Sequence, residues 1–427
     1  MTPRREPASI AQRLLWLIKH YRADFGALNC PLLCRLRGPL DEQALRSAVH
    51  ELAARHESLR TTFAGRAARL EQLVHPARAV PWTVLDVPRG TDPGDLVAAE
   101  VRTPLDPTEW PMRVTLWRVR DDEHVLCVNL HHLVTDAWST GVLLGELCAL
   151  YERAIGGTAE LAEPTWQYAR FAAWQHEQLS GDALSRHRDY WRRQLTGAQL
   201  ARFPAAQARP GEGRTGSAHA EIDPATVPAL WELARAHHTT LFTVLLTAFH
   251  LHLRRRTGQD DLAVASMFAN RSRAAVRGTV GLLANMVLLR VRAPGGATFA
   301  ELLQHAHAAV IGAFAFQDLP TQMLPGGVVD TGGRRVDDVV FNVMAEVEHT
   351  RRAGGLDVEL LIPDELGSRF GLELALVPVG GTELRAVLFY NDAQLTGDEA
   401  AAFLREYTYL VSLVVSEPKT VVSDILA

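Results

Sequence analysis

The chain has 427 residues, enough for two or three domains or for one large fold with two lobes. Hydrophobic residues make up 47% of it and charged residues 22%, a balance that excludes disorder, a collagen-like fibre and a small disulfide scaffold. The 44 Lys and Arg residues against 49 Asp and Glu residues give a net charge of −5, which argues against a general nucleic-acid binder.

The four cysteines are too few and too scattered for a disulfide framework, and no second Cys/His pair follows Cys30 and Cys34 at zinc spacing. We therefore interpret them as buried thiols. No apolar segment follows Met1, and no window approaches the length of uninterrupted apolar sequence that a membrane span needs. The sequence thus predicts a cytoplasmic protein without a signal peptide or a membrane-spanning helix.

Hydrophobic periodicity predicts an α/β protein with an N-terminal lobe over residues 1–180 and a C-terminal lobe over residues 181–427. In the N-terminal lobe we expect, in chain order, a helix at Ser9–Tyr21, a strand at Pro31–Leu36, a helix at Asp41–His56, strands at Leu59–Phe63, Leu70–Val74, Trp82–Leu85, Met112–Arg118 and Asp122–His132, and helices at Ser139–Ala154 and Thr165–Trp191. In the C-terminal lobe we expect helices at Asp223–His237 and Leu241–Leu253, strands at Leu262–Ser266 and within Gly281–Val291, a helix at Phe299–Phe314, strands at Val339–Met344 and Leu384–Tyr390, and a closing helix at Gly397–Val415.

The strand at Asp122–His132 is the most informative of these. Its odd-numbered residues from Val125 and its even-numbered residues from Leu126 are apolar almost throughout, so both faces are expected to be buried and the strand to be central in its sheet. It ends on a pair of histidines, His131 and His132. A loop that follows a rigid strand is a favourable place from which side chains can reach a cleft.

Asp136 follows His132 by four residues, which gives an HHxxxD pattern. Neutral imidazole accepts a proton near pH 7, so a histidine here is a candidate general base. Asp136 has two candidate roles: it could hold the imidazole, or it could pair with an arginine and fix the loop. We expect no metal site, because His131 and His132 point to opposite faces of the strand. No GxSxG, Walker A or GxGxxG pattern is present, so covalent catalysis and nucleotide binding have no support.

A longer series of motifs runs through the chain in a fixed order. The segments are Ser9–Trp16 (similar to SxAQxRLW), Arg55–Phe63 (RHExLRTxF), His131–Ser139 (HHxxxDGxS), Tyr168–Trp174 (YxDFAxW), the pair Tyr190 and Trp191, Val280–Asn285 (VGxFVN) and Phe316–Pro320 (QDxP). In these motifs and their order, the chain resembles the condensation domains of nonribosomal peptide synthetases, which belong to the chloramphenicol-acetyltransferase-like superfamily.

The resemblance implies an α/β (α+β) fold of two chloramphenicol-acetyltransferase-like lobes that form a V-shaped pseudo-dimer with a central tunnel. Carrier proteins would present phosphopantetheine thioesters at its mouths, so the chain itself would bind no cofactor. A donor acyl group would pass to an amine or hydroxyl acceptor, which is either carrier-bound or a small molecule. We expect a monomer that acts on neither nucleic acid nor membrane.

The resemblance also assigns roles to individual residues. His132 matches the motif histidine that positions or deprotonates the acceptor, and His131 matches the structural one. Asp136 matches an aspartate that holds the loop through a salt bridge to an arginine. Arg271, where the family has a Gly-Arg pair, is the first candidate for that arginine, and Arg60 is the second. Arg60 could instead only join its helix end to the sheet.

Four further residues are expected to line the tunnel: Ala137, Trp138, Ser139 and Asn285. Ala137 stands where the family motif has glycine. A glycine permits a positive φ or a close approach of the backbone, so the methyl group would narrow the tunnel or tilt the loop. Trp138 has two candidate roles, packing at the loop or substrate contact. Asn285 is expected on the acceptor side.

We therefore expect an acyltransferase that forms an amide or an ester in natural-product biosynthesis. One alternative is a catalytically silent condensation-like module that recruits a partner enzyme. Another is a CoA-dependent acyltransferase, which the absence of the superfamily's DFGWG segment disfavours. Because the chain starts with Met and a short polar leader, we expect a free-standing enzyme rather than an excised domain.

Overall fold

A computed structural model describes residues 2–21, 28–66, 69–88, 90–204, 213–324, 326–344, 350–361, 370–379 and 382–426. The chain divides into two compact units. Unit 1 contains Met1–Leu179, Ala269–Ala284 and Val347–Leu366, and unit 2 contains Ser180–Phe268, Asn285–Glu346 and Gly367–Ala427. The chain first crosses between the units within one residue of the expected boundary, but the two later segments of unit 1 were expected in the C-terminal lobe.

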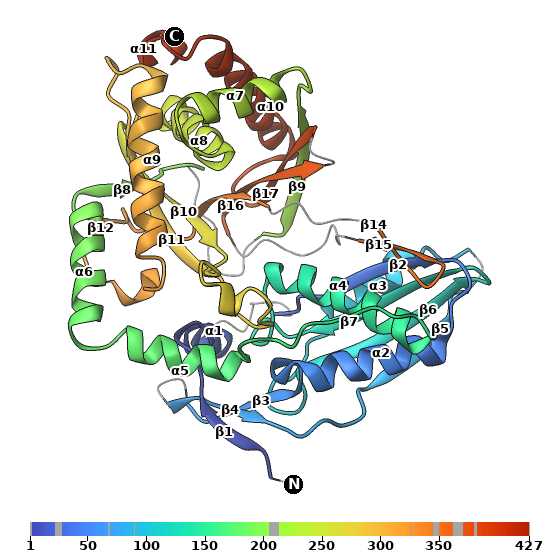
Figure 1. Cartoon of the computed structure of the whole chain (residues 1–427). Coiled ribbons are helices and arrows are strands. Elements are labelled where there is room, and N and C mark those ends of the chain that lie inside the picture. The colour runs from blue at the N-terminus through green and yellow to red at the C-terminus, as the bar shows by residue number, and fades with distance from the viewer. Residues whose placement is uncertain are drawn as a thin grey trace. The chain divides into compact units, whose positions relative to one another are not determined.

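Unit 1 is built on a six-stranded sheet in the order β14-β15-β2-β7-β6-β5. The strands are β2 (Leu32–Arg37), β5 (Trp82–Asp86), β6 (Met112–Arg120), β7 (Glu123–Leu130), β14 (Thr350–Ala353) and β15 (Leu356–Leu360). Strand β7 lies between β2 and β6 and pairs with both in antiparallel register (Figure 1). The hairpin β14–β15 extends the sheet because β15 pairs with the free side of β2, which explains why a late segment belongs to unit 1.

Both faces of this sheet are covered. Helices α2 (Glu42–Arg55) and α4 (Ala137–Ala154) share a core with the even-numbered residues of β7, and α3 (Pro93–Arg102) shares one with Val125 and Cys127. The prediction that β7 is a central strand buried on both faces is confirmed. Its rigidity matters because the HHxxxD loop follows directly after it.

The rest of unit 1 packs near the N-terminus. Its elements are the three-stranded sheet of β1 (Arg4–Pro7), β4 (Glu71–Val74) and β3 (Thr61–Ala64), with the 3₁₀ turn η1 (Glu57–Arg60) and helices α1 (Ile10–Tyr21) and α5 (Tyr168–Gln178). A core beneath them joins Trp16, Phe63 and Phe171 to Leu282 and Leu283 of the segment Ala269–Ala284. This apolar contact, together with the ion pair described below, places that segment in unit 1.

Unit 2 has an eight-stranded sheet in the order β12-β8-β10-β13-β16-β17-β9, with β11 paired to β10. Its strands are β8 (Ala198–Leu200), β9 (Thr215–Ile222), β10 (Asp261–Phe268), β11 (Asn285–Arg292), β12 (Val329–Asp330), β13 (Val339–Val343), β16 (Leu372–Val379) and β17 (Glu383–Asn391). Its helices are α6 (Gly181–Leu195), α7 (Thr226–Ala236), α8 (Leu241–Thr257), α9 (Phe299–Ala315), α10 (Gly397–Ser416) and α11 (Val422–Leu426), with 3₁₀ turn η4 at Thr321–Met323. Helices α7, α8 and α10 lie together in unit 2 (Figure 1).

Two predicted elements differ from the structure. The strand expected at Leu59–Phe63 starts only at Thr61, because Leu59 and Arg60 lie in η1. The helix expected over Thr165–Trp191 is two helices, α5 and α6, separated at Leu179 and Ser180. Gly181 has φ 51°, a left-handed conformation that glycine adopts without steric cost, so the chain can turn there. The break coincides with the first crossing between the units.

Candidate functional site

The loop after β7 carries the HHxxxD residues and leads directly into α4. Asp136 is the N-cap of α4: its backbone is extended, and its carboxylate accepts a hydrogen bond from the Ser139 backbone N–H at 2.9 Å. This satisfies one of the donors that every helix start leaves unpaired. The loop is therefore fixed at one end by the central strand and at the other by a capped helix.

His132 has a defined tautomer in this loop. Its backbone N–H donates to the Leu28 carbonyl at 2.7 Å, and its ring Nδ1 lies 2.8 Å from the Thr135 carbonyl. A carbonyl oxygen only accepts, so Nδ1 carries the proton and the neutral ring has its basic lone pair on Nε2. The side chain is partly buried. A half-buried imidazole with an oriented Nε2 has the form that a general base requires.

His131 is held differently. It is 2% exposed, its backbone N–H donates to the Pro111 carbonyl at 2.8 Å, and its ring Nδ1 accepts from the Leu133 backbone N–H at 3.0 Å. This residue also forms a β-bridge with Asn29. These contacts hold the backbone at the end of β7, and the structural role expected for the first histidine of the pair stays a prediction.

Asp136 is buried in an ion pair with Arg271, and both side chains are 1% exposed. Each carboxylate oxygen accepts three hydrogen bonds. Oδ1 receives them from the Ser139 N–H and hydroxyl and from Arg271 Nη2; Oδ2 receives them from Arg271 Nη1 at 2.8 Å and from the backbone N–H groups of Leu283 and Ala284. The carboxylate therefore ties the start of α4 to the segment Ala269–Ala284.

The electrostatics agree with this arrangement. Burial by itself raises the pKa of the Asp136 carboxyl, but the Arg271 charge and the hydrogen bonds from Arg271 and Ser139 outweigh it. The pKa therefore lies below its ordinary value of 3.8, and Asp136 is ionised at neutral pH. An ionised carboxylate with all its partners built in is suited to holding a loop in shape, not to moving protons.

The second candidate partner, Arg60, is not part of this ion pair. Its guanidinium donates to the backbone carbonyls of Ala54 and His75, and its remaining ionic contact is to Glu57 at 4.0 Å. Arg60 lies in η1, where these contacts join the end of α2 to β4. The salt-bridge role proposed for Arg60 is therefore wrong, and its alternative role of joining a helix end to the sheet describes its contacts.

Two expectations about Ala137 and Trp138 change with the structure. Ala137 is the first residue of α4, has no positive φ, and its side chain is exposed, so a glycine is not needed there for backbone conformation. Trp138 is 40% exposed, its Nε1–H donates to the Arg277 carbonyl at 3.0 Å, and its ring lies 5.7 Å from the Arg271 guanidinium. Trp138 thus joins α4 to the segment that carries Arg271.

Ser139 and Asn285 also differ from the expectation for tunnel residues. Ser139 is fully buried, bonded to Asp136 and to Gly281, and thus supports the ion pair. Asn285 starts β11 in unit 2 and is 7% exposed, and its side chain donates to the Gln317 carbonyl at 2.5 Å. That bond links the VGxFVN-like and QDxP-like segments.

Tyr168 was not singled out as a site residue, although it opens a recognised motif. Its hydroxyl donates to the Leu282 carbonyl at 2.7 Å and lies 2.7 Å from the Ser9 hydroxyl. Burial raises the pKa of this phenol, so it is a neutral donor. A β-carbon at Gly281 would lie 1.9 Å from the Tyr168 ring, so this packing requires glycine there. Tyr168 thus joins three motifs from distant parts of the sequence.

Within the described part of the chain, no group of three or more His, Cys, Asp and Glu side chains is placed to hold a metal ion. The same residues contain no helix that is both long and apolar enough to cross a membrane.

Burial raises the pKa of the Cys148 thiol to about 11, which makes it a poor nucleophile at neutral pH.

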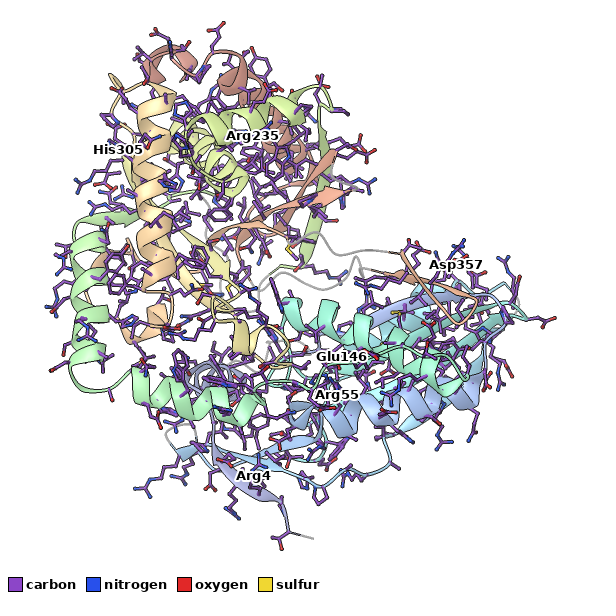
Figure 2. The ribbon with its side chains drawn as sticks, in the orientation of Figure 1. Arg4, Arg55, Glu146, Arg235, His305 and Asp357 are labelled. Atoms are coloured by element: carbon purple, nitrogen blue, oxygen red, sulfur yellow. The ribbon has the colours of Figure 1, made fainter. Side chains whose placement is uncertain are left out.

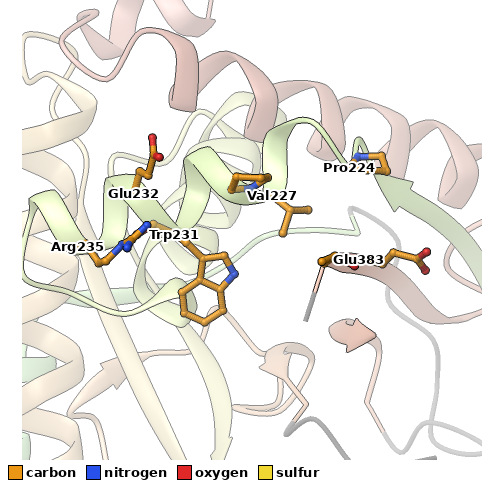
Figure 3. Close-up of a pocket in the computed structure, with 8 residues that line it drawn as sticks. Pro224, Val227, Trp231, Glu232, Arg235 and Glu383 are labelled. Carbon is orange, nitrogen blue, oxygen red and sulfur yellow. The ribbon is translucent and has the colours of Figure 1, made fainter. Parts of the chain in front are cut away.

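A surface cavity of about 630 Å³ lies in unit 2, beside α7 and the start of β17 (Figure 3). Trp231, Arg235 and Glu383 line it. None of its lining residues belongs to a recognised motif, and His132 and Asp136 belong to unit 1. We therefore place the candidate site on the HHxxxD loop instead of at this cavity.

Comparison with known proteins identifies the class to which this fold and loop belong. The family model for the condensation domain matches residues 4–427, so the chain belongs to the condensation domain family. Chondramide synthase of Chondromyces crocatus is 37% identical over 326 residues, which cover 74% of this chain. The match takes up 8% of the length of chondramide synthase, so the chain corresponds to a small part of it.

Two solved structures agree over nearly the whole chain. The X-domain from teicoplanin biosynthesis has a TM-score of 0.86 at 25% identity and covers 99% of this chain and 98% of its own. The first condensation domain of the calcium-dependent antibiotic synthetase, at 19% identity, has a TM-score of 0.80 and covers 99% of both chains. The α/β fold expected from the sequence, that of a condensation domain, is confirmed.

Proposed function

We propose that the chain transfers an acyl or aminoacyl group from a carrier-protein thioester to an amine, forming an amide, with a hydroxyl acceptor as the variant that gives an ester. The observation that carries this proposal is the fixed tautomer of His132. Its Nδ1 is held by the Thr135 carbonyl, so Nε2 is the basic nitrogen, and the ion pair of Asp136 with Arg271 holds the loop in place.

In the proposed reaction the acceptor nitrogen attacks the thioester carbonyl carbon. A proton passes from that nitrogen to Nε2 of His132 as the new C–N bond forms. The C–S bond then breaks, and the proton passes to the departing pantetheine sulfur, so charge and atoms balance. The phosphopantetheine arm is part of the substrate here and belongs to the carrier protein.

The decisive experiment combines the purified chain with an acyl-carrier donor and an amine acceptor and detects the amide by mass spectrometry. Replacing His132 with Ala should lower kcat/KM by roughly 10²–10⁴-fold, the range typical for loss of a general base, without changing the unfolding temperature. His219→Ala is the matched control, because His219 is an exposed histidine on β9 and should leave the rate unchanged. A near-normal rate for His132→Ala would contradict the proposal.

Two other functions give different results in the same assay. Product from acyl-CoA as well as from acyl-carrier would favour a CoA-dependent acyltransferase. No product with any acceptor, together with tight binding to a tailoring enzyme, would favour a silent recruiting module. This second candidate is kept because the X-domain from teicoplanin biosynthesis is similar in structure and has been solved in complex with OxyB.

A further inference from the structure

Asn270 has an unusual backbone. It is one of two non-glycine residues with a positive φ among those that the structure describes, at φ 54°. This is the left-handed region, which costs most residues energy and which asparagine tolerates better than other side chains with a β-carbon. The residue stands between Ala269, where the chain enters unit 1, and Arg271 of the buried ion pair.

The side chain of Asn270 is unusual too. It is only 4% exposed, yet neither its amide oxygen nor its amide nitrogen has a hydrogen-bond partner among the described residues. An asparagine amide offers two donor hydrogens and an oxygen with two lone pairs, and burying it without partners is unfavourable. Strained backbone clusters at active sites and ligand-binding positions, and a buried polar group without a partner calls for an explanation such as a ligand or an ordered water.

Another buried asparagine shows that this chain can satisfy such a side chain where its role is structural. Asn342 on β13 is 7% exposed, its oxygen accepts from the Met267 N–H at 2.9 Å, and its nitrogen donates to Glu373 at 2.8 Å. Within the described residues, Asn270 is the only buried asparagine or glutamine with both ends of its amide unpartnered.

The position of Asn270 connects it to the candidate site. Arg271, the next residue, is anchored by its bond to Asp136, and its guanidinium also donates to the carbonyl of Ala269, the residue before Asn270. The residues on both sides of Asn270 are thus fixed by the same guanidinium. The same ion pair fixes the loop that carries His132. The residues on either side of Asn270 are therefore tied to the loop that carries His132, and all of these residues belong to unit 1.

We propose that Asn270 is a substrate-binding residue whose side-chain amide exchanges hydrogen bonds with a secondary amide of the carrier-bound substrate. This inference rests on the proposed function. A secondary amide presents one N–H and one C=O, which complement the oxygen and the nitrogen of an asparagine. Two parts of such a substrate contain this group, the pantetheine arm and a peptide-like acyl chain.

The test uses three stable thioether probes, each measured by calorimetry against wild type and Asn270→Gly. The first is pantetheine carrying an N-acetylaminoethyl group, the second is pantetheine carrying an alkyl group of equal length, and the third is the N-acetylaminoethyl group on a methyl thioether without the arm. Glycine accepts the positive φ, so the substitution removes the amide without straining the backbone. Kd should rise about tenfold for the probes that carry the recognised amide, the effect of one lost hydrogen-bond pair.

The pattern over the probes identifies the amide. Weakening of the first and second probes alone assigns one of the two amides of the arm, and weakening of the first and third alone assigns the amide of the acyl chain. An unchanged Kd for all three probes overturns the inference and would mean that Asn270 is satisfied by solvent. If wild type binds none of the probes and makes no product, the inference and the proposed function both fail. Normal turnover with unchanged probe affinities removes only the inference.

Stability gives a second, independent readout. Asn270→Gly should raise the unfolding temperature by about 2 °C, because it removes a strained and unsatisfied residue. Asn342→Ala is the matched control, and it should lower the unfolding temperature while leaving probe affinity unchanged, since it deletes two hydrogen bonds within the fold. If Asn270→Gly lowers the unfolding temperature as Asn342→Ala does, Asn270 is a structural residue and the inference is wrong.

Discussion

Asp136 in unit 1 and His252 in unit 2 are both fully buried titratable residues, and the chain treats them in opposite ways. Asp136 stays charged because Arg271, Ser139 and two backbone N–H groups surround its carboxylate. His252 on α8 is 0% exposed, and neither of its ring nitrogens has a partner among the described residues. Its ring lies edge-on to the Phe403 ring, with the two ring centroids 4.2 Å apart. Burial lowers its pKa to about 3, so it is neutral at pH 7.

The difference shows at which buried position this fold stabilises a charged group. A buried charge is tolerable only when its hydrogen-bonding capacity is filled, and the chain fills it at the HHxxxD loop. At α8 the ring of His252 packs against Phe403, and neither of its nitrogens has a hydrogen-bond partner in the part of the chain that the structure describes. His250, two residues earlier, is intermediate: its ring nitrogens face the Leu246 and Leu289 carbonyls, and burial still lowers its pKa to about 4.

The largest expected effect comes from removing the charge that is fully partnered. Asp136→Ala leaves the Arg271 guanidinium buried without its counter-ion, which should cost about 3–5 kcal/mol of unfolding free energy. Amide formation should fall as well, because the loop that carries His132 loses its anchor. Urea unfolding followed by circular dichroism measures the stability directly.

Asp357→Ala is the control for this substitution. Asp357 on β15 pairs with Arg352 at 3.0 Å, and their side chains are 54% and 88% exposed (Figure 2). Exposed pairs of this kind contribute about 0–1 kcal/mol. A variant of Asp136 that is inactive but as stable as Asp357→Ala would show that the aspartate has a chemical role and not an architectural one.

The partly buried cluster of Arg55, Glu146 and His56 is intermediate in exposure between the buried pair of Asp136 and the exposed pair of Asp357. Glu146 on α4 accepts from Arg55 and His56 at 2.7 Å each, and Figure 2 shows Arg55 and Glu146 where α2 and α4 meet. Burial raises the pKa of Glu146, and the His56 and Arg55 contacts more than offset it, so the pKa lies below its ordinary value. The cluster gives α4 a second anchor, ten residues beyond Asp136 in sequence.

The next largest effect is a dependence on pH that arises at His252. Its pKa is about 3 in the folded chain and 6.5 in the unfolded chain. Between these two pH values the unfolded state therefore binds a proton at His252 and the folded state does not. The contribution of His252 to stability should therefore fall as the pH drops from 6.5 toward 3, by about 2–3 kcal/mol between pH 6.5 and 4.5 at about 1.4 kcal/mol per pH unit. His250, whose pKa is lowered to about 4, adds a decrease of the same sign. Asp136 titrates in the folded chain only below 3.8, so its contribution persists through this range.

His252→Leu tests this origin. The variant should match or exceed wild type in stability at pH 7, and its advantage should grow as the pH falls, because leucine carries no proton in either state. Unfolding free energies measured at pH 7, 6, 5 and 4.5 give the two slopes. Equal slopes for wild type and variant would show that His252 finds a partner that stabilises its charged form.

The sequence was sufficient for the parts of the site that are local. The alternation of apolar residues on both faces predicted β7 as a central strand, and the HHxxxD residues follow its end as expected. The helix after the loop was expected to start at Ser139, and the capping role of Asp136 was not predicted. Periodicity reports which residues share a face, and that is enough to place a strand and the residues that follow its end.

The parts that could not be read from the residues alone are the long-range ones. Arg271 and Asp136 are 135 residues apart in sequence, and only a family resemblance linked them. The hairpin β14–β15 was not expected, because its pairing with β2 depends on an edge formed more than 300 residues earlier. The unpartnered amide of Asn270 has no sequence signature at all, since it is defined by what surrounds it.

The smallest expected effect comes from removing one hydrogen-bond donor of Asp136 while its charge and its ion pair with Arg271 remain. The Ser139 hydroxyl donates to Asp136 at 2.7 Å and accepts from the Gly281 N–H at 3.1 Å. In Ser139→Ala the carboxylate keeps Arg271 and its backbone donors, so the loss should be about 1–2 kcal/mol, well below that of Asp136→Ala. Ser185→Ala on α6 removes an exposed hydroxyl bonded to the Gly181 carbonyl and should stay within about 0.5 kcal/mol of wild type. If Ser139→Ala costs as much as Asp136→Ala, the hydroxyl and not the ion pair anchors the loop, and the contrast with His252 no longer rests on charge.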